Sequence, residues 1–122
     1  MDATKQHGNL ALTPAVFDIL LALMDRERHG YGIMKEVENQ TEGDLVLRPG
    51  TLYQAIKRML ELGLIEESDE RPDPALDDER RRYYKISGLG RKVARTEVER
   101  LTKLLQIARS KKLTSALHEV SA

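Results

Sequence analysis

The chain has 122 residues, 40% of them hydrophobic, so it can bury one small core and little more. Its 20 basic and 20 acidic residues cancel, which argues against a protein that coats nucleic acid without selectivity, and the absence of Cys excludes disulfides and thiolate chemistry. The N-terminus lacks the apolar stretch of a secretion signal and no apolar run reaches about 18 residues, so we expect a cytoplasmic protein.

The first expected helix begins at Thr13 and Pro14, because Thr caps helix N-termini and Pro fits the first turn. Residues 1–11 before it are expected to be a flexible N-terminus. Its apolar residues recur at helical spacing and cover a wide face, which predicts a nearly buried helix. These residues are Val16, Phe17, Ile19, Leu20, Leu21 and Leu23.

A second, shorter helix is expected over residues 31–40, with Ile33, Met34 and Val37 facing inward. The polar stretch that follows, residues 41–48, contains the short apolar run Leu45, Val46 and Leu47. We expect a loop with a short strand at this run.

Two glycines, Gly30 and Gly32, lie one residue apart where the second helix begins. They indicate either a close approach between helices or a tight turn with a positive φ angle, and the pattern leaves both open. The neighbouring His29 is expected to be a turn residue rather than a ligand or a base.

The third expected helix begins near Pro49 and has the most informative pattern in the chain. One side carries the apolar residues Leu52, Ile56, Met59 and Leu60, and the other carries Tyr53, Gln54, Lys57 and Arg58. Amide and guanidinium groups suit base edges, whereas an ammonium or a phenol suits phosphates. We therefore expect Gln54 and Arg58 to contact bases, and Lys57 to contact either bases or phosphates.

Gly63 ends this helix, and the apolar pair Leu64 and Ile65 leads into a polar, Pro-broken run. Residues 80–87 then favour a second strand, so that helix, strand, polar loop and strand outline a winged helix-turn-helix. Arg80, Arg81 and Arg82 either contact phosphate or neutralise the acidic residues 77–79. Alternation along the strand sends Arg81 and Tyr83 to one face, and Arg82 and Tyr84 to the other, so only part of the arginine triplet faces DNA.

A long helix is expected after Ser87, which suits an N-cap. Its apolar residues recur at helical spacing, at Leu89, Val93, Val98, Leu101, Leu105 and Ala108. This stripe lies beyond a core that is already closed, so a second copy of the chain is the expected cover, although the helix could instead fold back on its own domain. Residues 111–122 either extend this helix or fray.

Short segments at fixed places resemble the PadR family of bacterial transcriptional regulators. They are Leu12 to Phe17, His29 to Ile33, Pro49 to Tyr53, Gly63 to Ile65, Arg81 to Tyr84, and Leu89 with Gly90, and together they cover about residues 12–100. Their order and spacing make the match specific, although each segment alone is weak.

The resemblance implies a mainly α fold with a small β-wing: a winged helix-turn-helix DNA-binding domain at residues 12–87 and a C-terminal dimerisation helix and tail at residues 88–122. It implies a homodimeric repressor that binds an inverted-repeat operator in double-stranded DNA through the third helix. Gly50, Thr51 and Tyr53 would lie near phosphates, with Tyr31 as a further backbone contact. The long helix would form the main dimer contact alongside the first helix, with Phe17.

Other functions are weaker interpretations of the same residues. An amphipathic helix with two cations is often only a solvated face, Tyr53 could cover the edge of the core, and a winged helix can be a protein-docking module that does not bind DNA. Some PadR relatives respond to small aromatic or hydrophobic effectors, but one Phe, four Tyr and no Trp provide no obvious aromatic cage. The three scattered His and the absence of catalytic motifs predict no enzyme, no metal and no cofactor.

Overall fold

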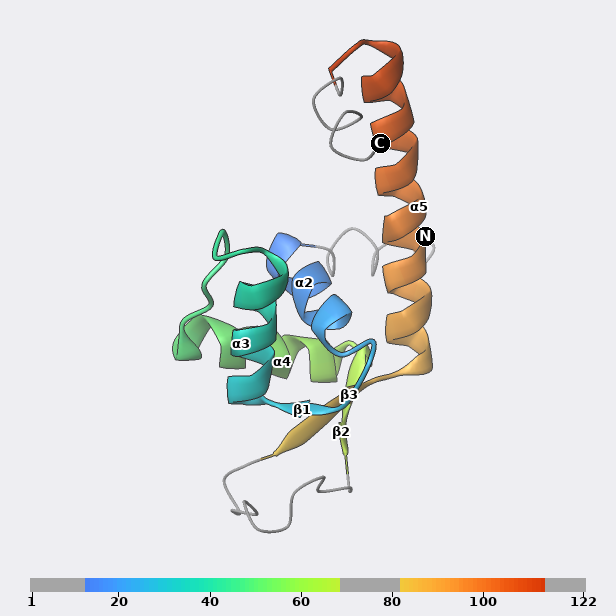
Figure 1. Ribbon diagram of the computed structural model, residues 1–122. Coiled ribbons are helices and arrows are strands. Elements are labelled where there is room, and N and C mark those ends of the chain that lie inside the picture. The colour runs from blue at the N-terminus through green and yellow to red at the C-terminus, as the bar shows by residue number, and fades with distance from the viewer. Residues whose placement is uncertain (1–12, 69–81, 114–122) are drawn as a thin grey trace.

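The computed structural model describes residues 13–68 and 82–113, and it has a mainly helical fold with one small antiparallel sheet (Figure 1). The helices are α2 (Pro14–Ala22), α3 (Gly30–Gln40), α4 (Pro49–Glu61) and α5 (Gly88–Ser110). The strands are β1 (Arg28–His29), β2 (Ile65–Ser68) and β3 (Tyr83–Ile86), in the sheet order β1-β3-β2. The mainly α fold with a β-wing is the one that the sequence predicts.

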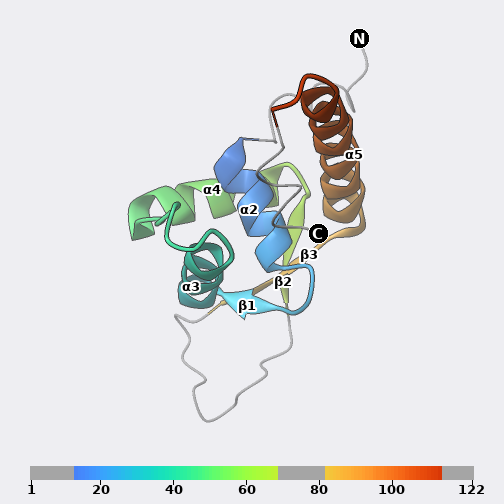
Figure 2. The ribbon, with the colours of Figure 1, turned by 45° about the horizontal axis from the view of Figure 1, so that its top comes forward.

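Helix α2 is the centre of the packing, because α3, α4 and α5 all contact it (Figure 2). Its predicted apolar face is buried at Val16, Ile19, Leu20 and Leu23. The other elements complete a single core around this helix. Their buried residues are Ile33, Val37, Leu47, Leu52, Ile56, Met59, Leu64, Ile65, Tyr84, Ile86, Val93 and Ala94.

Local capping explains where the helices begin and end. The Thr13 hydroxyl accepts a hydrogen bond from the Val16 backbone N–H at 3.3 Å, and Pro14 occupies the first turn of α2. At the end of α4, Gly63 has a φ angle of +76°, and the Leu64 N–H donates to the Met59 carbonyl at 2.9 Å. This hydrogen bond across a left-handed residue is a Schellman motif, so the predicted Gly stop is confirmed.

One expected strand is absent from the loop before α4, and this prediction is wrong. Residues 45–47 form no strand; instead Arg28 and His29 pair with Tyr84 and Tyr83 on β3. β3 therefore has β1 on one side and β2 on the other, so both of its own edges are already paired. Leu47 is buried in the core, whereas Val46 is 60% exposed.

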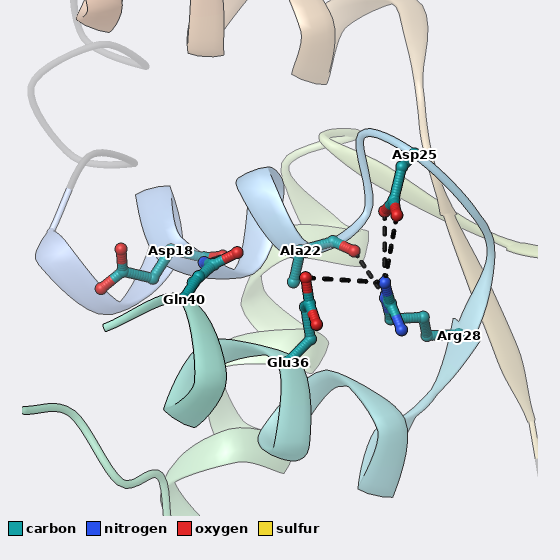
Figure 3. Close-up of polar contacts among 6 residues, drawn as sticks. All are labelled: Asp18, Ala22, Asp25, Arg28, Glu36 and Gln40. Atoms are coloured by element: carbon teal, nitrogen blue, oxygen red, sulfur yellow. Dashed lines mark hydrogen bonds and ion pairs between the residues drawn. The ribbon is translucent and has the colours of Figure 1, made fainter. Parts of the chain in front are cut away.

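Polar contacts fasten α3 to α2 and to the turn after it (Figure 3). The Arg28 guanidinium donates to the Ala22 carbonyl at 2.7 Å and to both carboxylate oxygens of Asp25 at 3.3 Å, and it lies 3.7 Å from a carboxylate oxygen of Glu36. Near the other end of α3, the Gln40 amide donates to the Asp18 carbonyl at 2.7 Å. These contacts fix the position of α3 against α2 and against the turn that follows α2.

Helix α5 has two halves that differ in their surroundings. In the first half, Ser87 caps the helix by accepting from the Gly90 N–H at 2.9 Å, and its hydroxyl donates to the Gly63 carbonyl at 2.6 Å. Val93 and Ala94 are buried in the core. The second half rises beyond the other described helices (Figure 1), and its apolar residues are exposed.

Candidate nucleic-acid interface

The outward side of α4 is a polar face on a rigid helix. Leu52, Ile56 and Met59 are buried, and the predicted contact residues on the other side are all exposed. These are Gly50, Thr51, Tyr53, Gln54, Lys57 and Arg58. We call these six residues the α4 face.

The cations of the α4 face are available to a partner. Among the residues that the structure describes, neither Lys57 nor Arg58 forms an ion pair, and Gln54 forms no side-chain hydrogen bond. Glu61 is also exposed near the C-terminal end of the same side, where it would repel a phosphate. Binding would therefore be strongest over the first three turns of α4.

Arg48 is a further exposed cation that sequence analysis did not single out. It is the N-cap residue of α4, and no side-chain hydrogen bond caps this helix end. The sequence contained the signal for this cation, because Arg48 directly precedes Pro49 and must therefore lie beside the first turn of the helix. Arg48 adds positive charge at the end where Gly50 and Thr51 lie.

Tyr31 lies on the first turn of α3 and is 59% exposed. Its ring stacks on His29 with the ring centroids 6.4 Å apart, and the Lys35 ammonium lies 5.6 Å from its centroid. His29 is the N-cap of α3, and its Nδ1 accepts from the Gly32 N–H at 3.1 Å. His29 therefore ends strand β1 and caps α3, rather than lying in a turn as predicted, and Tyr31 is held beside the start of α3.

The described part of the wing places one of the three predicted arginines. Arg82 is exposed, and its guanidinium lies 3.3 Å from the Glu67 carboxylate on β2. Arg80 and Arg81 lie outside the described residues. Tyr83 and Tyr84 follow on β3, and both are buried, at 8% and 6% exposed. Because successive strand residues point to opposite faces, each face of β3 carries one of these rings.

A hollow beside α3 is the place where an effector could be sought. It has a volume of about 700 Å³, and Arg28, Lys35, Glu36, Glu38 and Glu42 contribute charged side chains to its lining. This lining does not provide the apolar walls that an aromatic effector needs. Within the described ranges 13–68 and 82–113, no helix combines the length and apolar character needed to cross a bilayer.

Comparison with known families identifies the chain. The model of the transcriptional regulator PadR-like family matches residues 19–96, which is more than half of the chain and runs from α2 into α5. The chain belongs to the PadR-like family. Its members are transcriptional regulators rather than enzymes, which confirms the resemblance in the sequence motifs and implies regulation through DNA binding.

Similar proteins agree with this PadR-like assignment. A protein from Lysinibacillus sphaericus, described as "Uncharacterized protein X", is 30% identical over 73 residues, which are 60% of this chain. The chain spans 64% of the length of that relative.

Solved structures share the fold of this PadR-like chain. A transcriptional regulator from Clostridium thermocellum has a TM-score of 0.63 and 23% identity, covering 89% of this chain and 93% of its own. A PadR family transcription regulator from Clostridium difficile has a TM-score of 0.60 and 24% identity, covering 77% of this chain and 95% of its own. RosR from H. salinarum has a TM-score of 0.63 and 23% identity, covering 92% of this chain and 96% of its own.

The residues predicted for a dimer contact of the PadR-like chain lie in different surroundings. Val98, Leu101 and Leu105 are 46%, 41% and 38% exposed, and Leu104 and Ile107, which the predicted stripe omitted, are 49% and 50% exposed. Leu104 and Ile107 could have been found in the sequence, because each follows the previous apolar residue by three positions, from Leu101 to Leu104 and from Leu104 to Ile107. We call these five residues the α5 face.

The remaining predicted contact residues are covered to different extents by their own domain. Leu89 is 36% exposed, while Ala108 and Phe17 are half-buried, with Phe17 packed against the core. Val93 is buried at 7% exposed within the core. Val93 therefore packs inside its own domain and is not part of the uncovered face.

Proposed function

We propose that this PadR-like protein is a sequence-specific transcriptional repressor that inserts α4 into the major groove of double-stranded DNA. The observation that carries the proposal is the α4 face, where Gln54, Lys57 and Arg58 are exposed on a helix whose other side is anchored in the core. A helix of this width fits the major groove. Repression itself follows the family default that the sequence resemblance implies.

Each side chain of the α4 face has a role that its chemistry supports. Arg58 suits a guanine edge with two parallel hydrogen bonds, and Gln54 suits an adenine edge in the same way. Lys57 offers a mobile ammonium that can bind either a base or a phosphate. Gly50 and Thr51 at the start of the helix, together with Tyr53, would bind the sugar-phosphate backbone.

Contacts outside α4 would fix the orientation of the protein on the duplex. Tyr31 would bind backbone phosphate from the start of α3, and one or two of the wing arginines Arg80, Arg81 and Arg82 would reach the flanking backbone. Arg82 would have to exchange its exposed ion pair with Glu67 for a phosphate, and an exposed pair of this kind stabilises a protein by only about 0–1 kcal/mol. Breaking this ion pair on DNA binding would therefore cost little free energy.

The proposed repressor is a homodimer. The α5 face exposes five large apolar side chains on one protruding helix half, which is more than a single chain usually leaves open to water. A second copy of the same helix would cover this face, with Phe17 and Leu89 at its border. Twofold symmetry then requires an inverted-repeat operator with half-sites about one helical turn apart.

The protein acts in the cytoplasm, where it meets the DNA that it controls. No effector is assigned, because the charged hollow beside α3 does not suit the aromatic compounds to which some relatives respond.

Fluorescence anisotropy tests the proposal, using DNA from upstream of the protein's own gene and a scrambled duplex at several salt concentrations. We expect preference for the upstream DNA and affinity that falls steeply with salt, because bound cations release counterions from the phosphates. A variant with both Lys57→Ala and Arg58→Ala should lose the preference. A matched variant with Lys92→Ala and Arg95→Ala, two exposed cations of α5, should keep it.

Failure to bind any duplex at low salt would contradict the proposal and favour the alternative of a protein-docking module. Binding to every duplex with equal affinity would contradict sequence recognition through α4. Binding that survives the Lys57→Ala and Arg58→Ala changes would place recognition on another surface.

A further inference from the structure

The Tyr53 side chain packs against the start of α3. Its side chain leaves the edge of the α4 face, and its hydroxyl end lies over Gly30, the first residue of α3. A Cβ added at Gly30 would lie 2.8 Å from Cζ and 3.0 Å from Cε1 of Tyr53, and it would overlap the hydroxyl. Gly30 is buried while Tyr53 is 51% exposed, so the Tyr53 side chain touches the start of α3 and still leaves about half of its surface open.

Backbone conformation does not explain the glycine at position 30. Among the described glycines, positive φ angles occur at Gly43 and Gly63, so Gly30 has an angle that any residue can adopt. The sequence left open a close approach or a tight turn at Gly30 and Gly32, and the approach is the correct interpretation for Gly30. What position 30 requires is space for the Tyr53 ring.

Tyr53 also lies close to the sheet. Tyr84 is on the central strand β3, with Arg28 of β1 and Glu67 of β2 as its neighbours in register. Burial raises the pKa of Tyr84, nearby Glu67 and Tyr53 raise it further, and Arg82 lowers it. Tyr53 therefore lies where α4, the start of α3 and the wing strand meet.

We propose that Gly30 is a positioning residue for DNA binding, because the missing side chain lets Tyr53 seat its hydroxyl against the first turn of α3. This inference rests on the proposed function. In this seat the hydroxyl lies at the turn that also carries Tyr31, so Tyr53 would contact the phosphate backbone beside Tyr31. A side chain at position 30 would displace the Tyr53 ring from this seat.

A double-mutant cycle with Gly30→Ala, Tyr53→Ala and the combined variant tests the inference by anisotropy. Gly88→Ala is the matched control, because Gly88 is also the first residue of a helix and a Cβ there would meet nothing within 4 Å. We expect Gly30→Ala to weaken DNA binding about tenfold, the effect of losing one hydrogen bond to a charged group. In the Tyr53→Ala background the same change should alter the dissociation constant by less than about twofold.

Three results would overturn the inference: Gly30→Ala binds as the parent protein does, Gly88→Ala weakens binding equally, or the effects of Gly30→Ala and Tyr53→Ala multiply. Nuclear magnetic resonance of the DNA-free protein with labelled tyrosines separates this failure from failure of the proposed function. Even if no duplex binds, Gly30→Ala should shift the Tyr53 ring resonances and Gly88→Ala should not. Unshifted Tyr53 resonances in Gly30→Ala would overturn the positioning role.

Discussion

The uncovered sides of α4 and α5 differ in their chemistry. On α4, the helix is anchored by Leu52, Ile56 and Met59, and the side chains left open to water are polar: a hydroxyl, a phenol, an amide, two cations and one carboxylate. On the second half of α5, the side chains left open are large and apolar. A polar face is stable in water without a partner, whereas an apolar face gains free energy when another surface covers it.

This difference assigns separate tasks to the two helices. The α4 face can stay exposed until DNA arrives, and its interaction should depend on salt because it involves charge. The α5 face should be covered at all times, and its association should depend little on salt. Substitutions on one face should therefore leave the other interaction intact, apart from the loss of the second half-site when the dimer dissociates.

The largest effect is expected from Leu101→Glu combined with Leu105→Glu. Two unpaired carboxylates at the covered face should weaken dimerisation roughly a thousandfold or more, because each buried charge costs several kcal/mol. Sedimentation velocity at several protein concentrations measures this change. Thr102→Glu with Gln106→Glu adds the same charge on exposed positions outside the α5 face and should keep the dimer. A parent protein that is already monomeric would contradict the proposed role of α5.

Gly90→Ala is expected to have the next largest effect, and it acts on the packed half of α5. A Cβ at Gly90 would overlap the Leu64 backbone carbonyl oxygen and lie 2.8 Å from Cγ1 of Ile86. Backbone cannot yield as a flexible side chain can, so the free energy of unfolding should fall by about 1–3 kcal/mol or more. Urea denaturation measures the loss, and Gly88→Ala should change the value by less than about 1 kcal/mol. Equal unfolding free energies for the two variants would contradict this packing.

Single substitutions on the α4 face should separate base recognition from phosphate binding. Arg58→Ala should reduce discrimination at one base position by about 1–3 kcal/mol, and Lys57→Ala, if Lys57 binds phosphate, should weaken all sequences alike and lower the salt dependence by about one counterion. Competition binding with single-base operator variants measures both effects. Sedimentation of either variant should still show the dimer. An Arg58→Ala protein that keeps full discrimination would remove Arg58 from base recognition.

The smallest effect is expected from Glu97→Gln, at the border between the two halves of α5. The Glu97 carboxylate is buried and accepts hydrogen bonds from Arg100 at 2.7 and 2.6 Å, and these bonds lower its pKa despite the opposing effect of burial. Its stabilisation is therefore present above the ordinary glutamate pKa of about 4.3, and it is lost as the pH falls through the lowered value.

Because Arg100 is 58% exposed, solvent screens the pair and its stabilisation should be small. Thermal unfolding between neutral and acidic pH should show a difference between the parent and Glu97→Gln that shrinks on acidification. A difference that grows as the pH falls would contradict the role of the ion pair.

Most of the fold could be predicted because the decisive signals are local. Thr13, Gly63 and Ser87 mark helix ends through their own backbone or side-chain chemistry, and helical spacing identifies the buried side of α4. Strand β1 could not be predicted, because two residues, Arg28 and His29, carry no alternating pattern and pair only through their position beside β3. The run at residues 45–47 looked like a strand, but Leu47 is buried in the core while Val46 is exposed, and the run pairs with no strand.

The residues of the α4 face could be predicted more completely than those of the α5 face. The polar side of α4 follows directly from spacing, and its residues are exposed as expected. On α5, spacing alone could not separate Val93, which its own domain covers, from Leu101, which lies beyond the domain. The contact between Gly30 and Tyr53 could not be predicted either, because it depends on how α4 crosses the start of α3.

Selection of binding sites from a random duplex library by the parent protein would test most directly whether α4 reads DNA in a symmetric dimer. We predict enrichment of an inverted repeat with half-sites about one helical turn apart, and the same selection with Arg58→Ala should relax one position in each half-site. Enrichment of no sequence, or of a single asymmetric half-site, would contradict the claim that α4 reads DNA in a symmetric dimer.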